Sequence, residues 1–403
     1  MTTQLVRLGD YCRQDRTTVR PGERPDLRYI GLETIESGTG QFQDCELSKT
    51  PDVPQANSFH FATEHVLYGK LRPYLNKVAL PEFEGKCSTE IIPLRPDAAL
   101  DRRYLAYFLR SANTVAHISE RTAGARMPRA DMDFVLGLQL LLPSLDEQRR
   151  IIDMLSRAEG IVRLRREAQK KAAEIIPALF IDMFGDPAAN PKGWPTAPLS
   201  TVAEVISGVA KGRKLAPEES IELPYMRVAN VKDGHLDLSE VKRIAIKRTE
   251  ADRLLILPGD LLMTEGGDPD KLGRAALWRG EIEGCIHQNH IFKVRSDRLC
   301  LVPEYLRSLA GSSYGKAYFL SVAKKTTGIA SINKTQLSAF PVVLPPLASQ
   351  AEFRDRVASL EAIASQQVAA ISKAEEVFVT LLAREFTVAE QPSAQSETME
   401  AVA

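Results

Sequence analysis

Two long stretches of the chain repeat apolar residues at steps of three and four positions. The first follows Pro143 and runs to Gly185, and the second follows Pro346 and runs to Phe386. This spacing places the apolar side chains on one face of an α-helix. A helix of roughly 40 residues extends about 60 Å, and an apolar stripe of that length favours a partner helix. Pro177 should kink or end the first helix late, because proline has no backbone N–H to donate.

The two helical stretches open with related sequences, which indicates an internal duplication. "LPSLDEQRRIIDML" (142–155) and "LPPLASQAEFRDRV" (344–357) share identities at a shift of 202 positions. Four further pairs keep a similar shift: "YIGLETIESG" (29–38) with "YMRVANVKDG" (225–234), "IIPLRPD" (91–97) with "IFKVRSD" (291–297), "YLAYFLRS" (104–111) with "YLRSLAGS" (305–312), and "RTAGARMPRADM" (121–132) with "KTTGIASINKTQL" (325–337). A repeat at a nearly constant shift predicts that both halves fold as the same unit.

Short β-type runs bounded by turn residues fill the sequence before each helix, for example "RYIGLETI", "STEIIPL", "DLLMTE" and "HIFKVRS". We therefore predict an α+β fold in which two globular modules alternate with two long, coiled-coil-like helices. The predicted segments are 1–143 (first module), 144–185 (first helix), 186–346 (second module), 347–386 (second helix) and 387–403. The last segment has no apolar periodicity, so we expect it to be a disordered tail.

The composition is that of a globular protein and argues against a membrane protein. The 403 residues contain 44% hydrophobic and 26% charged side chains, with 52 basic and 52 acidic residues. No apolar run is long enough to span a bilayer. The start of the chain lacks the apolar core of a signal peptide, and the cysteines are scattered without a CxxC pair. These features predict a cytoplasmic protein with free thiols.

Sequence motifs of catalytic and metal sites are missing. The chain has no GxxxxGK[ST], GxSxG or HExxH motif. "CIHQNH" offers Cys285, His287 and His290, but no second ligand pair follows, so we interpret it as the start of a strand and expect no metal. "NPKGWP" (190–195) lacks the aromatic residue of the Asn-Pro-Pro-aromatic loop that holds a flipped adenine, and we interpret it as a linker. We expect no catalytic residues in this chain.

Loops at equivalent places in the two halves combine cationic, polar and glycine residues. They are "YGKLRPYLNKVAL" (68–80) and "PGDLLMTEGGDPDKLGRAALW" (258–278). Arginine, lysine, asparagine and tyrosine can bond base edges or phosphates, and glycine lets the backbone approach a groove. With basic segments elsewhere, the candidate DNA-contact residues are Lys70, Arg72, Tyr74, Asn76, Lys77, Arg126, Arg129, Lys211, Arg213, Lys214, Gly266, Gly267, Lys271, Arg274, Asn333 and Lys334. On their own, these residues also fit hairpin loops with solvated charges.

The order of these features resembles the specificity subunits of type I restriction–modification systems. The resemblance covers residues 1–386 and rests on the duplication, the "LP.L..Q" helix openings, "MFGDP…NPKGW" (183–194), "YGKLRPYLNK" and "LLMTEGGDPDKLGRAALW". It implies that each module is a target recognition domain that reads one half of a split double-stranded DNA sequence. It also implies that the two helices pair antiparallel and hold the domains apart, and that the chain itself is not an enzyme.

The resemblance further implies a set of partners. Two N6-adenine methyltransferase subunits would dock on the chain, and two ATP-dependent restriction subunits would join them for cleavage. S-adenosylmethionine, ATP and Mg²⁺ would then belong to the partners, and no cofactor is expected in this chain. Because the two candidate loops share almost nothing except position, we predict an asymmetric, non-palindromic target.

Two other functions stay open at this level. One is a protein-interaction scaffold that does not bind DNA, which would protect no DNA sequence and would behave independently of salt. The other is a DNA-modifying enzyme with an unrecognised motif, which would cleave or methylate DNA as the isolated chain.

Overall fold

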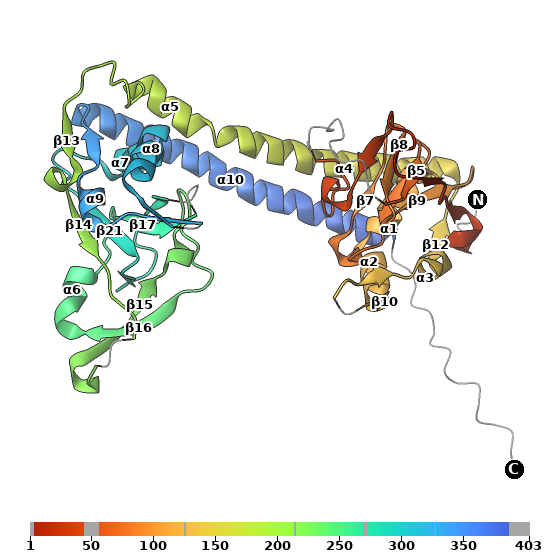
Figure 1. Cartoon of the computed structure of the whole chain (residues 1–403), viewed down its shortest axis with the longest axis horizontal. Helices are drawn as coiled ribbons and strands as arrows, with labels where there is room; N and C mark the ends of the chain where they lie inside the picture. Colours follow the sequence, from red (N-terminus) through yellow and green to blue (C-terminus); the bar gives the residue numbers. More distant parts are fainter. Residues whose placement is uncertain are drawn as a thin grey trace, which may run out of the picture. The chain divides into compact units, whose positions relative to one another are not determined.

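The computed structural model describes residues 4–43, 56–124, 126–212, 215–268, 272–326 and 328–386. The chain divides into two compact units. Unit 1 comprises residues 1–166 and 369–403, and unit 2 comprises residues 167–368. Each unit joins one β-rich module to part of both long helices, and Figure 1 labels these elements. The predicted tail, 387–403, lies outside the described residues.

The module of unit 1 is built from short, mostly antiparallel strands. Its strands are β1 (Gln4–Arg7), β2 (Cys12–Gln14), β3 (Thr18–Val19), β4 (Arg28–Ile30), β5 (Ser58–Phe61), β6 (Val66–Gly69), β7 (Val78–Ala79), β8 (Gly85–Ser88), β9 (Ile91–Pro96), β10 (Thr122–Ala123), β11 (Arg129–Ala130) and β12 (Gln139–Leu142). One sheet has the order β2-β9-β6-β7, another has β3-β5-β8-β4, and β1 pairs with β12 and β10 with β11. The helices of the module are α1 (Arg102–Arg110), α2 (Ala112–Glu120) and α3 (Met132–Gly137).

The module of unit 2 repeats this plan. Its strands are β13 (Thr196–Pro198), β14 (Ala203–Ser207), β15 (Ser220–Met226), β16 (Lys242–Lys247), β17 (Leu261–Thr264), β18 (Gly266–Gly267), β19 (Ala275–Leu277), β20 (Ile286–His287), β21 (Ile291–Ser296), β22 (Lys324–Thr326), β23 (Ile329–Ser331) and β24 (Pro341–Val343). The sheet orders are β14-β21-β17-β19, β16-β15-β20, β18-β23-β22 and β13-β24. The helices are α6 (Ala251–Leu254), α7 (Pro303–Gly311), α8 (Ser313–Val322) and α9 (Lys334–Ser338).

The repeat is visible in strand pairing as well as in order. The sheet β2-β9-β6-β7 corresponds to β14-β21-β17-β19, and the ribbon β1-β12 corresponds to β13-β24. Among the strands that the structure describes, β4 pairs parallel with β8 in unit 1, and β15 pairs parallel with β20 in unit 2. Parallel pairing of short strands is an unusual detail to share by chance, so the predicted internal duplication is confirmed.

The long helices agree with the apolar periodicity, including the predicted interruption. They are α4 (Leu145–Ala172), α5 (Ile175–Phe184) and α10 (Leu347–Glu385). Pro177 lies in the first turn of α5, where its missing N–H does least harm. Just before it, the N–H of Glu174 bonds the carbonyl oxygen of Lys171, three residues back, at 3.1 Å. The prediction that Pro177 interrupts the first helix is confirmed, and α10, which has no proline, is continuous.

The helices pair antiparallel in unit 1. Arg166 of α4 contacts Glu375 of α10 at 2.6 Å, and Met154 contacts Arg384 at 3.7 Å. Residue numbers therefore rise along α4 as they fall along α10. In unit 2, the ring of Phe353 on α10 packs against Phe180 and Phe184 of α5, with centroids 5.6 and 5.4 Å apart.

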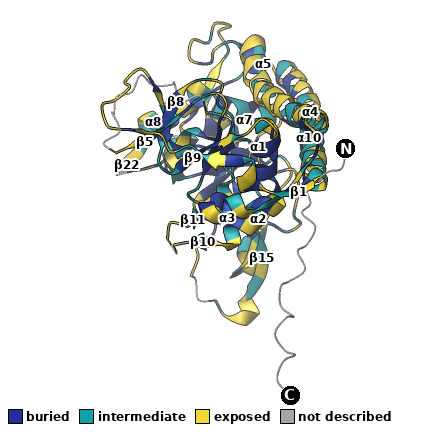
Figure 2. Cartoon of the chain, turned by 90° about the vertical axis from the view of Figure 1, so that its right-hand side faces the viewer, coloured by how far each residue is buried: buried dark blue, intermediate teal, exposed yellow. Residues whose placement is uncertain are grey.

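Each module packs against the end of one long helix through an aromatic pair. In unit 1, Tyr104 of α1 contacts Phe386, directly after α10, with ring centroids 4.9 Å apart. In unit 2, Tyr305 of α7 contacts Phe184, the last residue of α5, at the same 4.9 Å. The tyrosine hydroxyls also match, because Tyr104 donates to the Leu141 carbonyl at 2.9 Å and Tyr305 to that of Val343 at 2.8 Å. In Figure 2, β9 and α1 are mainly dark blue, which marks the buried core of unit 1.

The glutamine of each "LP.L..Q" motif is fully buried and joins the start of a long helix to its module. Gln148 donates to the carbonyl oxygens of Ala99 (2.9 Å) and Pro143 (3.0 Å) and accepts from the N–H of Asp101 (2.8 Å). Its amide therefore fastens α4 to the segment that opens α1.

Gln350 makes the same set of bonds in unit 2. It donates to Cys300 (3.1 Å) and Pro345 (2.8 Å) and accepts from Val302 (2.9 Å). Because a buried amide must be satisfied, this repeated motif fixes the register of each helix against its module.

A glutamate about three turns after each glutamine adds a second connection. Glu159 accepts from Arg110 at 2.5 Å and from the Tyr107 hydroxyl at 3.0 Å. Its counterpart Glu361 contacts Arg307 at 2.7 Å and Arg279 at 2.5 Å. Glu159 therefore connects α4 to α1, and Glu361 connects α10 to α7.

None of the helices in the described part of the chain combines the length and the apolar character needed to cross a bilayer.

Replacing Gln148 or Gln350 by leucine should destabilise the fold. Each change leaves two carbonyl oxygens and one N–H unpaired in a buried place, which we expect to lower the free energy of unfolding by about 3 kcal/mol. Thermal or denaturant unfolding measures the loss. The matched control is Gln169→Leu, an exposed position on α4. Equal stability of Gln148→Leu and Gln169→Leu would contradict the role assigned to the buried amide.

Candidate nucleic-acid interface

The β6–β7 loop of unit 1 presents two exposed side chains, Arg72 and Tyr74. Arg72 has φ +52°, and its N–H donates to the Pro128 carbonyl at 2.7 Å. This bond holds the loop against the segment before β11 and leaves the Arg72 side chain exposed. Tyr74 is 55% exposed, which is high for an aromatic residue beside a folded core. Both side chains face solvent and can reach a ligand.

Asn76 and Lys77, from the same loop, bond inward. Asn76 has φ +49°, and its side-chain amide donates to the Arg110 carbonyl at 3.0 Å. The Lys77 ammonium donates to the carbonyl of Leu32 at 2.6 Å. The structure thus gives both residues a role in holding the loop, which sequence alone did not distinguish from a surface role.

A second basic segment, around β11, lies against this loop. Arg126 is exposed. Arg129 binds Glu90 through its Nε (3.1 Å) and Nη2 (2.9 Å), and this carboxylate raises the pKa of the Arg129 guanidinium. Lys70 lies 3.9 Å from the same carboxylate. Two cations and one anion therefore meet at one place and carry a net positive charge.

The glycine loop of unit 2 forms strand β18, which pairs with β23. Gly266 lies opposite Ser331 and Gly267 opposite Ala330. A Cβ at Gly266 would come within 2.9 Å of the Ala330 carbonyl oxygen, so this strand contact requires glycine. Arg274 follows at the end of the loop and is partly exposed.

The remaining candidates of unit 2 divide between structural and exposed positions. Asn333 caps α9 by accepting from the N–H of Gln336 at 2.9 Å. Lys334 is exposed in the first turn of α9. The Lys211 ammonium lies over the Tyr225 ring, 5.7 Å from its centroid. Three candidates, Arg213, Lys214 and Lys271, lie outside the described residues.

The two loops are built on the same backbone frame. In unit 1, the N–H of Lys70 donates to the Glu90 carbonyl (2.9 Å), and the Lys70 carbonyl accepts from Ala130 (2.8 Å).

In unit 2, the N–H of Glu265 donates to the His290 carbonyl (3.0 Å), and the Glu265 carbonyl accepts from Ile332 (2.8 Å). In unit 1 the frame joins the loop after β6 to the segment near residue 130. In unit 2 it joins the loop after β17 to the segment near residue 332. The frame of each unit therefore brings together described segments that are far apart in sequence.

Sequence reasoning missed three residues on this surface: Glu90, Glu265 and His290. Glu265 Oε2 accepts from His290 Nδ1 at 2.7 Å, and both side chains are partly exposed. Glu90 and its partner Arg129 are 39 residues apart in the sequence, so no local pattern indicates the pair. The repeat indicates two of the three, because Glu90 and His290 both precede a matching "I-x-x-x-R" strand at a shift of 200 positions.

The "CIHQNH" side chains point to different places. Burial raises the pKa of Cys285 to about 12, and burial lowers the pKa of His287 to about 4 while its Nδ1 bonds the Ile291 carbonyl at 2.9 Å. His290 is at the surface with Glu265. Among the residues that the structure describes, no three His, Cys, Asp or Glu side chains group as metal ligands would.

The "NPKGWP" segment forms a tight turn on its own backbone. Asn190 has φ +42°, accepts from the Trp194 N–H at 3.0 Å and donates to the Trp194 carbonyl at 2.8 Å. Its amide is thus occupied locally, in agreement with the interpretation of this segment as a linker.

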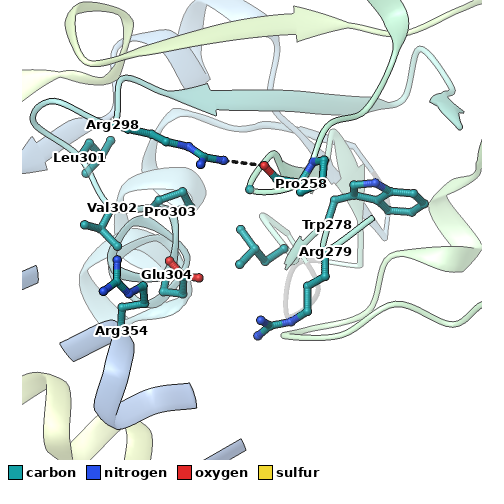
Figure 3. Close-up of a pocket in the computed structure, with 11 residues that line it drawn as sticks. Pro258, Trp278, Arg279, Arg298, Leu301, Val302, Pro303, Glu304 and Arg354 are labelled. Atoms are coloured by element: carbon teal, nitrogen blue, oxygen red, sulfur yellow. Dashed lines mark hydrogen bonds between the residues drawn. The ribbon is translucent and has the colours of Figure 1, made fainter. Parts of the chain in front are cut away.

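A pocket of about 360 Å³ in unit 2 lies beside the start of α7 (Figure 3). Three arginines line it, and each is bound within the fold. Arg298 donates to the Pro258 carbonyl at 2.6 Å, Arg279 pairs with Glu361, and Arg354 pairs with Asp355. Internal partners account for these charges, so we assign the pocket no ligand.

No family model matches the chain. The chain is 25% identical over 316 residues to the type I restriction enzyme StySPI specificity subunit of Salmonella potsdam. The alignment covers 73% of this chain and 66% of that relative, so it spans slightly less than two thirds of the relative's length.

Two solved structures share the fold over nearly the whole chain. One comes from work on complex assembly and conformational transition of the type I R-M system; it has a TM-score of 0.61 and 22% identity, covering 95% of this chain and 97% of that chain. The other is the type I restriction–modification system S subunit from M. genitalium, with a TM-score of 0.52, 12% identity and 97% coverage of both chains. The comparisons confirm the α+β fold and the resemblance to type I restriction–modification specificity subunits that the sequence motifs indicate.

Proposed function

We propose that this chain is the sequence-specific DNA-recognition subunit of a type I restriction–modification complex. The observation that carries the proposal is the repeated backbone frame of the two candidate loops, which holds different charged side chains in each unit. A frame that is kept while its exposed residues change is suited to reading two different sequences. Residues 1–143 and 186–346 are then the target recognition domains, and each reads one half of an asymmetric, split target.

The proposed contacts come from residues whose side chains reach the surface. In unit 1 they are Lys70, Arg72, Tyr74, Arg126 and Arg129. In unit 2 they are Lys211, Arg274 and Lys334, with Arg213, Lys214 and Lys271 proposed from the sequence alone. Asn76, Lys77, Gly266, Gly267 and Asn333 support the contact by shaping the loops. Arginine and lysine would supply phosphate contacts and donors to guanine, and Tyr74 would stack or bond a phosphate.

In this proposal the long helices (144–185 and 347–386) separate the domains and receive two copies of an N6-adenine methyltransferase. Restriction subunits would join for cleavage. S-adenosylmethionine, ATP and Mg²⁺ would be bound by these partners, and the chain would contribute recognition without a catalytic step.

Exposed apolar side chains at equivalent positions of the repeat support the proposal that two identical partners bind. Ile161 and Ile363, at equivalent positions of the repeat, are 50% and 54% exposed, and Ile175 and Val377 are 46% and 48% exposed. Lys171 with Lys373 and Glu174 with Glu376 are further identical, exposed pairs. Unit 1 contains Ile161 and Val377, and unit 2 contains Ile363 and Ile175. Large apolar side chains that stay exposed twice at the same place are typical of an interaction surface.

The first test is a genome-wide map of N6-methyladenine in cells that express this chain with its methyltransferase. We expect one split, asymmetric motif that disappears when the chain is deleted, because the two loops differ. A palindromic motif would contradict the asymmetry. If no new motif appears although the methyltransferase is expressed and folded, DNA recognition is the wrong function.

Arg72→Ala should weaken DNA binding, since Arg72 is exposed on a loop built to present it. We expect a loss of about 1–3 kcal/mol if the contact is to a base, or a drop of about 1 in the slope of log K against log salt if it is to a phosphate. Binding isotherms of the full complex at several salt concentrations separate these cases. Arg13→Ala, an exposed arginine on β2, is the control. An unchanged affinity and slope would remove Arg72 from the interface.

Ile161→Asp and Ile363→Asp should each release one methyltransferase copy, and the double variant should release both. A charge in an apolar contact must lose its water or break the contact. Native mass spectrometry counts the bound copies. Val368→Asp is the matched control, because Val368 is 48% exposed on α10 but its counterpart in the repeat is Arg166. Full occupancy of the double variant would place the docking surface elsewhere.

A further inference from the structure

The shared backbone frame allows residues of the two units to be compared position by position. Lys70 corresponds to Glu265, because the N–H and the carbonyl of each make the same two frame bonds. Glu90 and His290 correspond as the carbonyl partners in those bonds. The strand pairs agree, since Gly69 lies opposite Ile91 in unit 1 and Thr264 opposite Ile291 in unit 2.

The charge at the first pair of corresponding positions is reversed, and the second pair exchanges a carboxylate for an imidazole. Unit 1 has the cation Lys70 after its strand and the anion Glu90 opposite, whereas unit 2 has the anion Glu265 and the basic ring of His290. Arg129, which adds a second cation in unit 1, lies opposite Leu71, and its counterpart opposite Gly266 is the neutral Ser331. The same part of the frame therefore carries two cationic hydrogen-bond donors in unit 1 and an accepting carboxylate in unit 2.

We propose that this part of the frame reads a base edge in both half-sites with opposite hydrogen-bond polarity, through two side chains that are neighbours in the frame but not equivalent in the repeat. In unit 1, Arg129, oriented by Glu90, donates to the acceptors of a guanine. In unit 2, Glu265, oriented by His290, accepts from the exocyclic amino group of a cytosine or an adenine. This assignment rests on the proposed function and names the chemical class that each domain recognises.

The geometry of Arg129 leaves the necessary donors. A guanidinium has five N–H groups. Among the described residues, Glu90 receives bonds from Nε and Nη2, and the Met127 carbonyl receives one from Nη1 at 3.3 Å. One N–H each on Nη1 and Nη2 remains, which is the number of donors that guanine O6 and N7 require.

The geometry of Glu265 leaves an acceptor. His290 bonds Oε2, and the other carboxylate oxygen, Oε1, can accept a further bond. A carboxylate on a DNA-facing loop is repelled by phosphates, so its favourable partners are the amino groups at base edges. The pair with His290 restricts the rotamers of Glu265 and so prepares it for one direction of approach.

The test compares the DNA motifs selected by the full chain with its methyltransferase and by the same complex carrying Glu265→Gln or Arg129→Gln. Duplexes with randomised sequence are bound, recovered and sequenced. For Glu265→Gln we expect the preference at one base pair of one half-site to fall by about 5- to 150-fold, with the other half-site unchanged. Arg129→Gln should do the same to one guanine of the opposite half-site.

Exposed side chains of the same type outside the frame provide the controls. Glu283→Gln in unit 2 and Arg13→Gln in unit 1 should return the wild-type motif. Because both charge pairs are partly exposed, all variants should keep the melting temperature of the wild type.

The outcomes separate this inference from the proposed function. If the wild-type complex selects no sequence, the proposed function fails. If it selects a split motif and Glu265→Gln returns the same motif, the polarity assignment is wrong. Equal weakening of both half-sites, or complete loss of binding by a folded variant, would also overturn it, because one base contact affects one position of one half-site.

Discussion

A fully buried glutamine at the start of each long helix sets the register of that helix against its module. A long amphipathic helix can shift by a turn against an apolar surface at little cost, because apolar contacts have no direction. Gln148 and Gln350 remove that freedom by making three directed bonds each to backbone groups of their modules. A shift would leave a buried amide unpaired. The free energy lost in this way is larger than the difference in apolar contact energy between the two positions of the helix.

The other end of each helix is fixed by aromatic packing, and this joins the two halves of the duplication. Gln148 lies in α4, and the following helix, α5, ends on Phe184, which packs against Tyr305 of unit 2. The helix that starts on Gln350 ends before Phe386, which packs against Tyr104 of unit 1. Each module therefore holds the start of one long helix and the end of the other. The same pair of contacts occurs in each unit, as the internal duplication predicts.

The parts of this structure that could be predicted are those with a local or repeated signal. The three–four spacing located α4 and α10, Pro177 located the break before α5, and the shift of 202 positions located the repeat. The inward bonds of Asn76 and Lys77 had no such signal, because a loop lysine or asparagine has the same pattern in sequence whichever way it faces. Their direction follows from a left-handed backbone and from carbonyls supplied by distant elements. Partners such as Glu90 and Arg129 likewise meet only through the fold.

The charged loop positions and the buried glutamine positions differ in how much change the fold tolerates. This difference explains how one duplicated module can acquire two specificities. The loop frame is held by backbone bonds, which do not depend on side-chain identity. The charged side chains on it are partly exposed, and pairs of that kind contribute about 0–1 kcal/mol. A lysine in unit 1 and a glutamate at the equivalent position of unit 2 are therefore both tolerated with little effect on stability. The glutamines have no such freedom, since each satisfies three buried groups. Recognition can diverge at the loops while the helix attachment stays fixed.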